Sequence, residues 1–315
     1  MVKTAVVIPA YKVADKIGAV IRSIPASIDT IIVVDDKCPQ RSGDVAAAME
    51  GLGKDRLVVL YNDVNMGVGG AVVRGLKKAL ALQCDIIVKM DGDGQMDAAY
   101  IDKLIAPLIS GEADYTKGNR FMNFTALKTM PKVRLFGNSV LSFLLKIASG
   151  YWNVIDPTNG YTAIHRRAAE RLNLDGIARR YFFESDMLIN LNIINAVVRD
   201  IDIPARYGDE ESSLSILRTS LEFPPRLLRG VIRRIFFKYF LYDFNMASIY
   251  IIIGLPMFIF GVVFGVMEWM DSIINATVKT SGTIMLVALP IIVSFQMLLQ
   301  AIAIDINSVP KKDKW

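Results

Sequence analysis

The sequence has few of the residues that build disulfide frameworks, zinc sites and histidine-based active sites. Its 315 residues include only two cysteines, Cys38 and Cys84, and one histidine, His165. The two cysteines lack metal-ligand spacing, which argues against a disulfide framework or a zinc site. His165 stands beside Arg166 and Arg167, so we expect it at the surface, at the end of a strand and outside the chemistry.

Other common features are missing as well. The amino terminus lacks the charged, apolar and small-residue order of a signal peptide, so we expect the amino-terminal part to stay in the cytosol. No internal repeat stands out, and a formal net charge of +5 does not by itself indicate a nucleic-acid partner. The chain is nevertheless 53% hydrophobic with a mean hydropathy of +0.38, and the excess lies after Ala247.

Short apolar runs alternate with helical patterns in the first third of the chain. We expect strands at residues 5–8, 30–34, 57–60 and 86–90, with helices at 16–24, 43–49 and 70–82 between them. Strand, helix, strand with short connections predicts right-handed crossovers and a mostly parallel sheet in an α/β domain.

The most informative stretch is the acidic loop after the fourth predicted strand. The apolar run at residues 86–90 ends in Asp91, Asp93 and Gln95, separated by glycines. Ligands of open α/β sheets bind at the carboxyl ends of the strands. Hard oxygen ligands at this edge suit Mg²⁺ or Mn²⁺ bridging a diphosphate. The alternative is a solvated turn, because Asp-Gly pairs are ordinary turn formers.

Polar residues also follow the other predicted strands. Tyr11 could stack on a base, or lie half-buried in the core. Asp35 or Asp36 could accept hydrogen bonds from a base N–H or a ribose hydroxyl. A glycine cluster that starts at Gly67 opens a helix, and we expect it to leave amino-terminal N–H groups available for a ligand. Polar residues at one sheet edge favour a nucleotide site.

Four motifs in this order resemble glycosyltransferase family 2, and within it the polyprenyl-phosphate glycosyltransferases such as the dolichol-phosphate mannose synthase group. They are VIPAY at residues 7–11, VVDD at 33–36, N-x-G-x-G at 65–69 and MDGDGQ at 90–95. The resemblance implies a GT-A catalytic domain, a nucleotide-sugar donor, a polyprenyl (undecaprenyl) phosphate acceptor and inverting transfer. One departure is Lys37-Cys38-Pro39, where relatives carry Gly-Ser or Asn-Ser, which leaves the base of the donor open.

The resemblance also implies roles for particular residues. The metal ligands are Asp91, Asp93 and Gln95. The catalytic candidates are Asp93, Arg120 and Arg134, the two arginines meeting phosphates. The remaining candidates bind substrate: Pro9, Tyr11, Asp35, Asp36, Gly67, Asp91, Asp156, Asn159, Glu184, Asp186 and Arg206. For Glu184 and Asp186 the alternative is a role as acids that favour a helix amino terminus.

The carboxyl-terminal third predicts a membrane attachment. We expect a catalytic domain at residues 1–225, an amphipathic helix in the headgroup plane at 226–246, a two-helix hairpin at 247–304 and a basic tail at 305–315. Pro256 and Pro290 should kink the two spans without ending them. The arginines before the hairpin and the lysines after it place the catalytic domain and the tail in the cytoplasm, in a two-pass protein of the cytoplasmic membrane.

Other functions stay open beside transfer to a polyprenyl phosphate. An acceptor with a sugar hydroxyl, on a glycan or a lipid, would need a base from Asp93, Asp97, Glu184 or Asp186. A processive synthase is disfavoured because no Gln-x-x-Arg-Trp motif occurs, and a nucleotidyltransferase because its basic glycine-rich loop is missing. A non-enzyme alternative is a silent membrane scaffold that binds a nucleotide sugar. The expected partners are the donor, the acceptor, membrane lipid, a flippase and a second copy of the chain, and no nucleic acid.

Overall fold

A computed structural model describes residues 2–51, 53, 56–120, 132–204 and 216–312, without the side chains of residues 132–138 and 216–221. The chain divides into two compact units. The first consists of Met1–Arg234 with Pro310–Trp315, and the second of Ile235–Val309.

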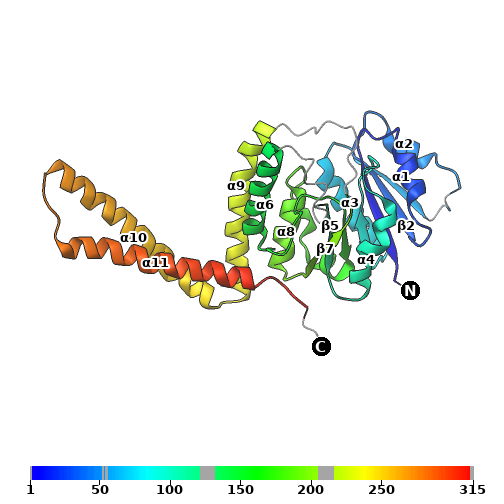
Figure 1. The fold of residues 1–315 in the computed structure, drawn as a ribbon. Coiled ribbons are helices and arrows are strands. Elements are labelled where there is room, and N and C mark those ends of the chain that lie inside the picture. Colours follow the sequence, from blue (N-terminus) through cyan, green and yellow to red (C-terminus); the bar gives the residue numbers. More distant parts are fainter. Residues whose placement is uncertain (1, 52, 54–55, 121–131, 205–215, 313–315) are drawn as a thin grey trace. The chain divides into compact units, whose positions relative to one another are not determined.

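A seven-stranded mixed sheet forms the centre of the first unit, in the order β3-β2-β1-β4-β6-β5-β7 (Figure 1). β1, β2, β3 and β4 pair in parallel, as the sequence predicts, and β5 pairs in parallel with β7. β6 runs antiparallel to both β4 and β5. The strands are β1 (Thr4–Ala10), β2 (Thr30–Asp35), β3 (Leu57–Tyr61), β4 (Ile86–Lys89), β5 (Tyr115–Asn119), β6 (Thr162–His165) and β7 (Val198–Asp202).

Helices connect the strands. The crossovers among the first four strands run through α1, α2 and α3, in agreement with the predicted alternation. The helices of the first unit are α1 (Ile17–Ser23), α2 (Ser42–Ala47), α3 (Gly67–Ala81), α4 (Ile101–Ile109), α6 (Lys132–Ser149), α7 (Arg166–Arg171), α8 (Phe183–Ile193) and α9 (Ile216–Ile235), with short 3₁₀ turns η1 (Ala98–Tyr100) and η2 (Leu174–Gly176).

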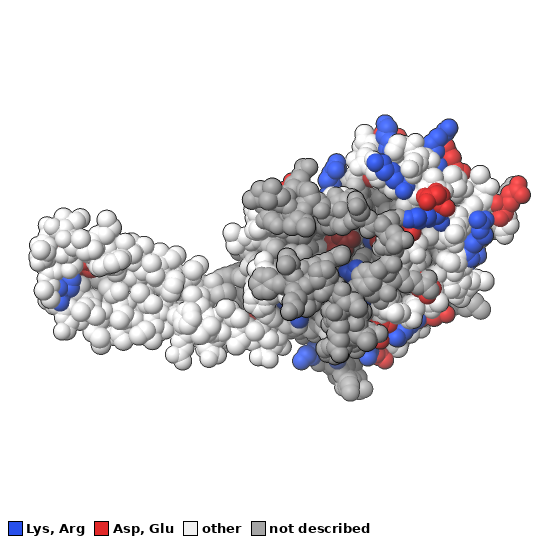
Figure 2. Space-filling view, turned by 45° about the horizontal axis from the view of Figure 1, so that its top comes forward, with Lys and Arg blue, Asp and Glu red and all other residues white. Residues whose placement is uncertain are grey.

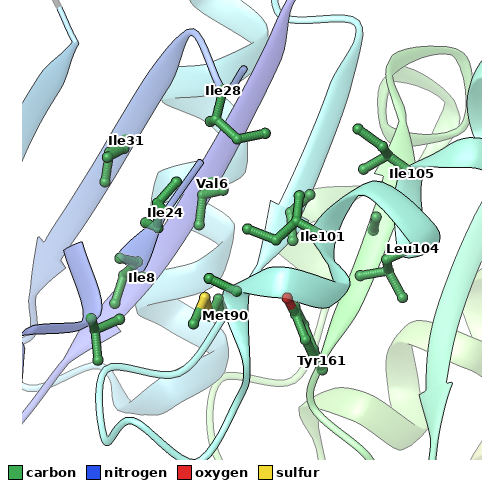
Figure 3. Close-up of a cluster of buried hydrophobic side chains, with 14 of the residues drawn as sticks. Val6, Ile8, Ile24, Ile28, Ile31, Met90, Ile101, Leu104, Ile105 and Tyr161 are labelled. Carbon is green, nitrogen blue, oxygen red and sulfur yellow. The ribbon is translucent and has the colours of Figure 1, made fainter. Parts of the chain in front are cut away.

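The main core lies between the sheet and the helices α1 and α4. Branched aliphatic side chains from β1 and β2, among them Val6, Ile8 and Ile31, pack against Ile101 and Leu104 (Figure 3). All six residues of β2 are buried, which is typical of a strand covered on both faces. This rigid core fixes the carboxyl ends of β1, β2 and β4, where the predicted site residues begin.

A second apolar cluster joins α6, α8 and α9. Leu145, Phe182, Ile189 and Leu227 are its buried members, and Val231 packs against them. Part of the helix that was expected in the headgroup plane therefore packs on the protein, because Leu227 and Val231 face this cluster. The reason is that α9 has two apolar faces, and the other face remains exposed on the protein.

The second unit contains a helical hairpin. α10 (Met246–Ile274) and α11 (Ser281–Asn307) are the two described helices that are long and apolar enough to cross a membrane. Both continue through their prolines, as predicted. α10 ends at Ile274, and the side-chain amide of the next residue, Asn275, donates to Asp271 Oδ1 at 2.7 Å. A π-helical segment, η3 (Phe236–Tyr242), precedes α10.

Candidate active site

The aspartates after β2 are buried and bind the surrounding backbone. Asp35 accepts hydrogen bonds from Cys38 N and Gly43 N, both at 2.7 Å. Asp36 Oδ1 accepts from the Asn62 side chain at 2.7 Å and from Met66 N at 2.8 Å, and its Oδ2 accepts from Gly67 N at 2.7 Å. Both carboxylates therefore hold loops together within the protein.

The amino terminus of α3 is also engaged by the protein. Gly67 N donates to Asp36, and Gly70 N donates to the carbonyl of Arg179 at 3.0 Å. The expectation that the glycine cluster leaves these two N–H groups available is therefore wrong. Gly67 has a φ of +78°, and a Cβ there would overlap the carbonyl of Arg179, so glycine is required by the close approach of this segment.

The acidic loop after β4 keeps its carboxylates less occupied. Asp93 Oδ1 accepts from Gln95 N at 3.0 Å. Burial raises the pKa of Asp93, the charge of Asp91 adds to this, and the Gln95 hydrogen bond opposes it. Two carboxylates and a side-chain amide are the oxygen ligands that Mg²⁺ and Mn²⁺ prefer. No group of three or more His, Cys, Asp or Glu that could hold a metal occurs in the described residues. A cation bound at this loop would therefore also need oxygen atoms from a bound substrate.

A buried lysine lies directly beneath this loop. Lys89, at the end of β4, is 4% exposed, and its Nζ lies 2.7 Å from Asp91 Oδ1 and 3.7 Å from Glu184 Oε1. Burial lowers its pKa, but the carboxylates of Asp91 and Glu184 outweigh burial and leave the pKa above its ordinary value. The sequence analysis missed Lys89, although a lysine that ends an otherwise apolar strand was a usable signal.

A second buried lysine lies in the same row of the sheet. Lys89 and Lys117 both pair with Thr162, from opposite sides of β6, and directly paired residues project to the same face of a sheet. Lys117 is fully buried and donates to the carbonyl of Asn159. Burial lowers its pKa to about 8, and the charge of Asp156 opposes this. The site thus combines several carboxylates with two buried amines.

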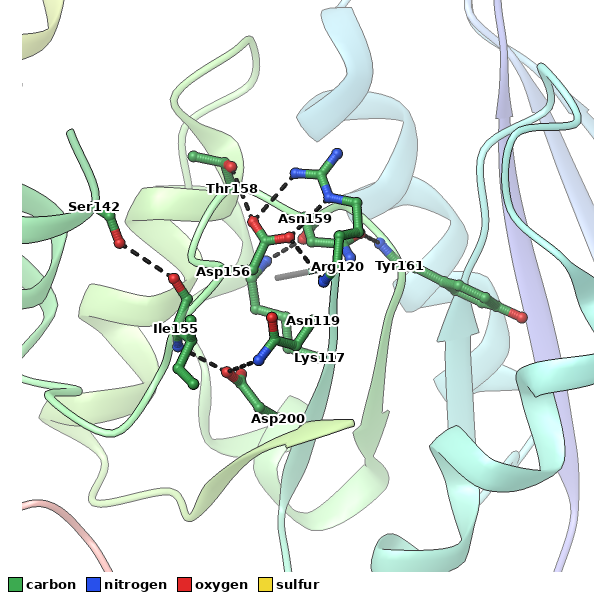
Figure 4. Close-up of polar contacts among 10 residues, drawn as sticks. All are labelled: Lys117, Asn119, Arg120, Ser142, Ile155, Asp156, Thr158, Asn159, Tyr161 and Asp200. Carbon is green, nitrogen blue, oxygen red and sulfur yellow. Dashed lines mark hydrogen bonds and ion pairs between the residues drawn. The ribbon is translucent and has the colours of Figure 1, made fainter. Parts of the chain in front are cut away.

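Arg120 is held by a buried carboxylate. Its Nε donates to Asp156 Oδ2 at 2.8 Å and its Nη2 to Oδ1 at 3.1 Å, a two-pronged contact that fixes the plane of the guanidinium (Figure 4). Thr158 Oγ1 also donates to Asp156, at 3.2 Å. Asp156 is 0% exposed, whereas the Arg120 side chain is 38% exposed. Asp156 therefore orients Arg120, and the structure brings these two predicted site residues together.

Asn159 and Asp200 complete the polar network in Figure 4. The Asn159 side-chain oxygen accepts from Tyr161 N at 3.0 Å, so it stabilises the loop before β6. Asp200 Oδ2 accepts from Ile155 N at 2.7 Å, while its Oδ1 has no hydrogen-bond partner within the described residues. Burial raises the pKa of Asp200 to about 6.

The two predicted acids of α8 point to different partners. Both lie in its first turn. Glu184 approaches Lys89 and hence the acidic loop. Asp186 accepts from Ala178 N at 2.8 Å and forms an ion pair with Arg233 of α9 at 2.5 Å. Asp186 therefore links two helices, and Glu184 is the one that joins the charged cluster.

The remaining candidates vary in what the structure shows. Pro9 is paired with Val34 inside the sheet, and Tyr11 is 44% exposed just beyond the end of β1. The side chain of Arg134, in α6, and all of Arg206 lie outside the described residues. His165 caps α7, its Nδ1 accepting from Arg167 N at 3.1 Å.

Comparison with known proteins defines the class. Residues 5–172 match Glycosyl transferase family 2, and the chain belongs to this family. It is a glycosyltransferase enzyme with a GT-A fold, as the motifs predict.

Several curated relatives carry polyprenyl phosphates in their names. A UDP-N-acetylglucosamine–dolichyl-phosphate N-acetylglucosaminyltransferase of Methanococcus voltae is 33% identical over 195 residues, 58% of this chain and 77% of that one. The polyprenol monophosphomannose synthase of Mycolicibacterium smegmatis is 25% identical over 68% of this chain and 80% of its own length. The undecaprenyl-phosphate mannosyltransferase of Micrococcus luteus is 26% identical over 65% and 83%.

A solved structure shares the fold. Glucosyl-3-phosphoglycerate synthase of Mycobacterium tuberculosis, in complex with Mn²⁺, UDP-glucose and phosphoglyceric acid, has a TM-score of 0.53 at 20% identity. The similarity covers 74% of this chain and 79% of that one. At this identity the similarity shows the fold alone.

Proposed function

We propose that this enzyme transfers a hexose or N-acetylhexosamine from a UDP- or GDP-sugar to a polyprenyl phosphate, with inversion at the anomeric carbon. The observation that carries the proposal is that a family 2 catalytic domain continues into two helices long and apolar enough to cross a membrane. A lipid acceptor requires an enzyme at the membrane surface. Three relatives named for dolichyl, polyprenol and undecaprenyl phosphates support it.

The donor would bind at the carboxyl edge of the sheet. The exposed ring of Tyr11 is available to stack on the base. Asp91, Asp93 and Gln95 would hold Mg²⁺ or Mn²⁺, which neutralises the leaving diphosphate when bound. Lys89 keeps one oxygen of Asp91 fixed at 2.7 Å, so the other oxygen of this carboxylate is the one that can face a ligand.

A phosphate acceptor would need positively charged side chains to hold it, and it would not need a general base to activate it. A phosphate monoester is largely ionised at neutral pH because its second pKa is near 6, so its oxygen can attack without giving up a proton to the enzyme. Arg120, oriented by Asp156, would hold a phosphate in place, with Arg134 as a second candidate. Asn159 and Glu184 would lie near the sugar.

The membrane topology follows from the charges that flank the hairpin. Arginines precede α10 and lysines follow α11, whereas at the far end of the hairpin Lys279 is paired with Glu268 and Asp271 in the last turns of α10. On the face of the hairpin that Figure 2 shows, charged side chains gather at the end that is farther in sequence from the catalytic domain, around Lys279 and Asp271. We propose that both ends of the hairpin, and with them the catalytic domain, face the cytoplasm.

The test is transfer of radiolabelled sugar from a panel of UDP- and GDP-sugars to undecaprenyl and dolichyl phosphates. The purified full chain is assayed with Mn²⁺, Mg²⁺ or EDTA. We expect a metal-dependent product that partitions into organic solvent and that Asp93→Ala abolishes. The matched control is Asp175→Ala, which removes an exposed carboxylate paired only with Lys77 on the surface.

The same assay separates the alternatives. Transfer to a lipid-linked sugar or a glycan, with none to either polyprenyl phosphate, would replace the acceptor while keeping the class. Nucleotide-sugar binding without transfer to any acceptor would contradict the enzyme mechanism and support a binding scaffold.

A further inference from the structure

Two glutamines lie on the outer face of α11, among apolar side chains. Gln296 and Gln300 are exposed and four residues apart, so they share one face of the helix. With Ile292, Phe295 and Leu299 they line a shallow groove. Neither amide has a hydrogen-bond partner among the described residues. The face of α11 that carries Gln296 and Gln300 is called the glutamine face below.

The inner face of α11 is different, because it is already filled. A Cβ at Gly261 of α10 would meet Ile291, and one at Gly265 would meet Val287, so the two helices are closely packed. Ser294 is fully buried there, and its hydroxyl donates to the carbonyl of Ile291 at 3.1 Å. The polar group on the inner face is therefore satisfied within its own helix, and those on the glutamine face are not.

Gln296 lies deep in the apolar part of the helix, and Gln300 lies one turn nearer to its carboxyl end. At 1.5 Å per residue, Gln296 is about 25 Å along the chain from Lys279 and about 13 Å from Asp305, the nearest charged residues on either side. Water cannot reach such a position in a bilayer. An amide without a hydrogen-bond partner in hydrocarbon is costly, so this face favours association with a partner that offers polar groups.

We propose that the glutamine face docks against the same face of a second copy of this chain, as a symmetric dimer within the membrane. A glutamine side chain carries both a donor and an acceptor, so two copies related by a twofold axis satisfy one another without any charged group. The exposed side chains of Phe295 and Leu299 would enter the neighbouring groove. Isologous pairing of this kind is the commonest symmetry of homo-oligomers.

The outer face of α10 provides the contrast within the same hairpin. It also has a groove, but all of its lining is apolar: Leu255, Pro256, Ile259, Phe260, Val263, Phe264 and Met267. Lipid tails can fill such a groove at no cost in hydrogen bonds, and so could a polyprenyl chain. The proposed dimer therefore uses α11 and leaves α10 facing lipid.

The test measures self-association of the full chain in lipid vesicles by energy transfer between labelled copies at increasing lipid dilution. We expect Gln296→Leu/Gln300→Leu to weaken association about tenfold, because each interhelical hydrogen bond between side chains contributes modestly to helix association in a membrane. Gln296→Asn/Gln300→Asn keeps the amides and should retain much of the association. The matched control, Ile259→Ala/Val263→Ala on α10, should dimerise like the wild type.

The proposal rests on the membrane insertion proposed above, and extraction with alkaline carbonate tests that part first. Release of the wild type by carbonate would overturn both the insertion and the dimer. A membrane-embedded wild type that stays monomeric, or a double leucine variant that associates as tightly as the wild type, would overturn the dimer alone. Sugar transfer to lipid is assayed separately, so failure of the proposed reaction leaves the result on association distinct.

Discussion

Two pairs of aspartates lie at the carboxyl ends of two parallel strands, β2 and β4, which flank β1 on either side, and they use their oxygens differently. Asp35 and Asp36, after β2, accept five hydrogen bonds from the surrounding loops, four of them from backbone N–H groups. Asp91 and Asp93, after β4, lie beside Lys89 and accept a single backbone N–H from Gln95. The first pair builds the loops of the site, and the second pair is available for ligand chemistry.

This difference shows that the position of an aspartate at a strand end does not determine whether it binds a ligand or stabilises the protein. Both pairs are at the carboxyl edge that binds ligands in α/β sheets. What separates them is the number of protein donors: Asp35 and Asp36 accept two and three hydrogen bonds, and Asp93 accepts one. The contrast can be tested by comparing the free energy of unfolding with the rate of sugar transfer.

The largest effect on stability is expected at Asp36. Asp36→Ala leaves the Asn62 amide, Met66 N and Gly67 N without their acceptor, at about 1–3 kcal/mol for each buried donor. We expect a loss of about 3–6 kcal/mol in chemical denaturation of the full chain in detergent. Asp63→Ala, on the exposed neighbouring loop, is the control. A loss below about 1 kcal/mol would show that water replaces the carboxylate.

A smaller loss is expected at Lys89. Lys89→Met keeps the length of the side chain but leaves Asp91 and Glu184 without their shared cation. Because both carboxylates are partly exposed, we expect a loss of about 1–3 kcal/mol together with slower sugar transfer. Lys77→Met breaks an exposed ion pair with Asp175 and should cost less than about 1 kcal/mol. Equal losses of unfolding free energy in the two variants would contradict the role of Lys89 as the shared cation of Asp91 and Glu184.

Asp200 should give a gain that depends on pH. Its pKa is raised to about 6 in the folded state, against about 3.9 when unfolded. The folded state thus binds more protons between pH 4 and 6, and the wild type loses stability as the pH rises through this window. We expect Asp200→Asn to gain about 1–3 kcal/mol relative to the wild type between pH 4 and pH 7. Parallel stability curves for the two proteins would contradict the raised pKa.

The smallest effect on stability and a large effect on activity are expected together at Asp93. Burial and the charge of Asp91 both oppose its ionised form, so Asp93→Ala should change the free energy of unfolding by less than about 1 kcal/mol. Transfer should fall by about 100-fold or more. If Asp93→Ala unfolded as readily as Asp36→Ala, the two pairs would not differ in the way described.

The sequence predicted the parallel half of the sheet because its strands are continuous apolar runs separated by helical patterns. It did not predict the place of β6, whose four residues run antiparallel between β4 and β5, since a short strand pairs through contacts distant in sequence. That pairing places Lys89 and Lys117 on either side of Thr162. The sequence of neither strand alone could therefore predict that these two lysines lie in the same row of the sheet.

The candidate site shows the same limit. The acidic loop and Arg120 could be singled out because each follows a strand and matches a motif. Their partners could not, because hydrogen bonds such as those of Asp36 to Met66 and Gly67 depend on how two loops meet. Residue types and spacing indicate which groups reach the sheet edge, but not which of them the protein itself occupies.

The two apolar faces of α9 have a consequence for how the catalytic domain of this chain can be produced. Phe223, Leu227 and Val231 cover Leu145 and Ile189 of the catalytic domain, while Leu228 and Ile232 stay exposed, at 61% and 62%. A soluble fragment that stops at residue 225 would uncover this apolar surface and aggregate, whereas one that stops at Arg234 would keep it covered. α9 is thus part of the domain's own hydrophobic core, and the boundary of the folded catalytic unit lies after this helix and not before it.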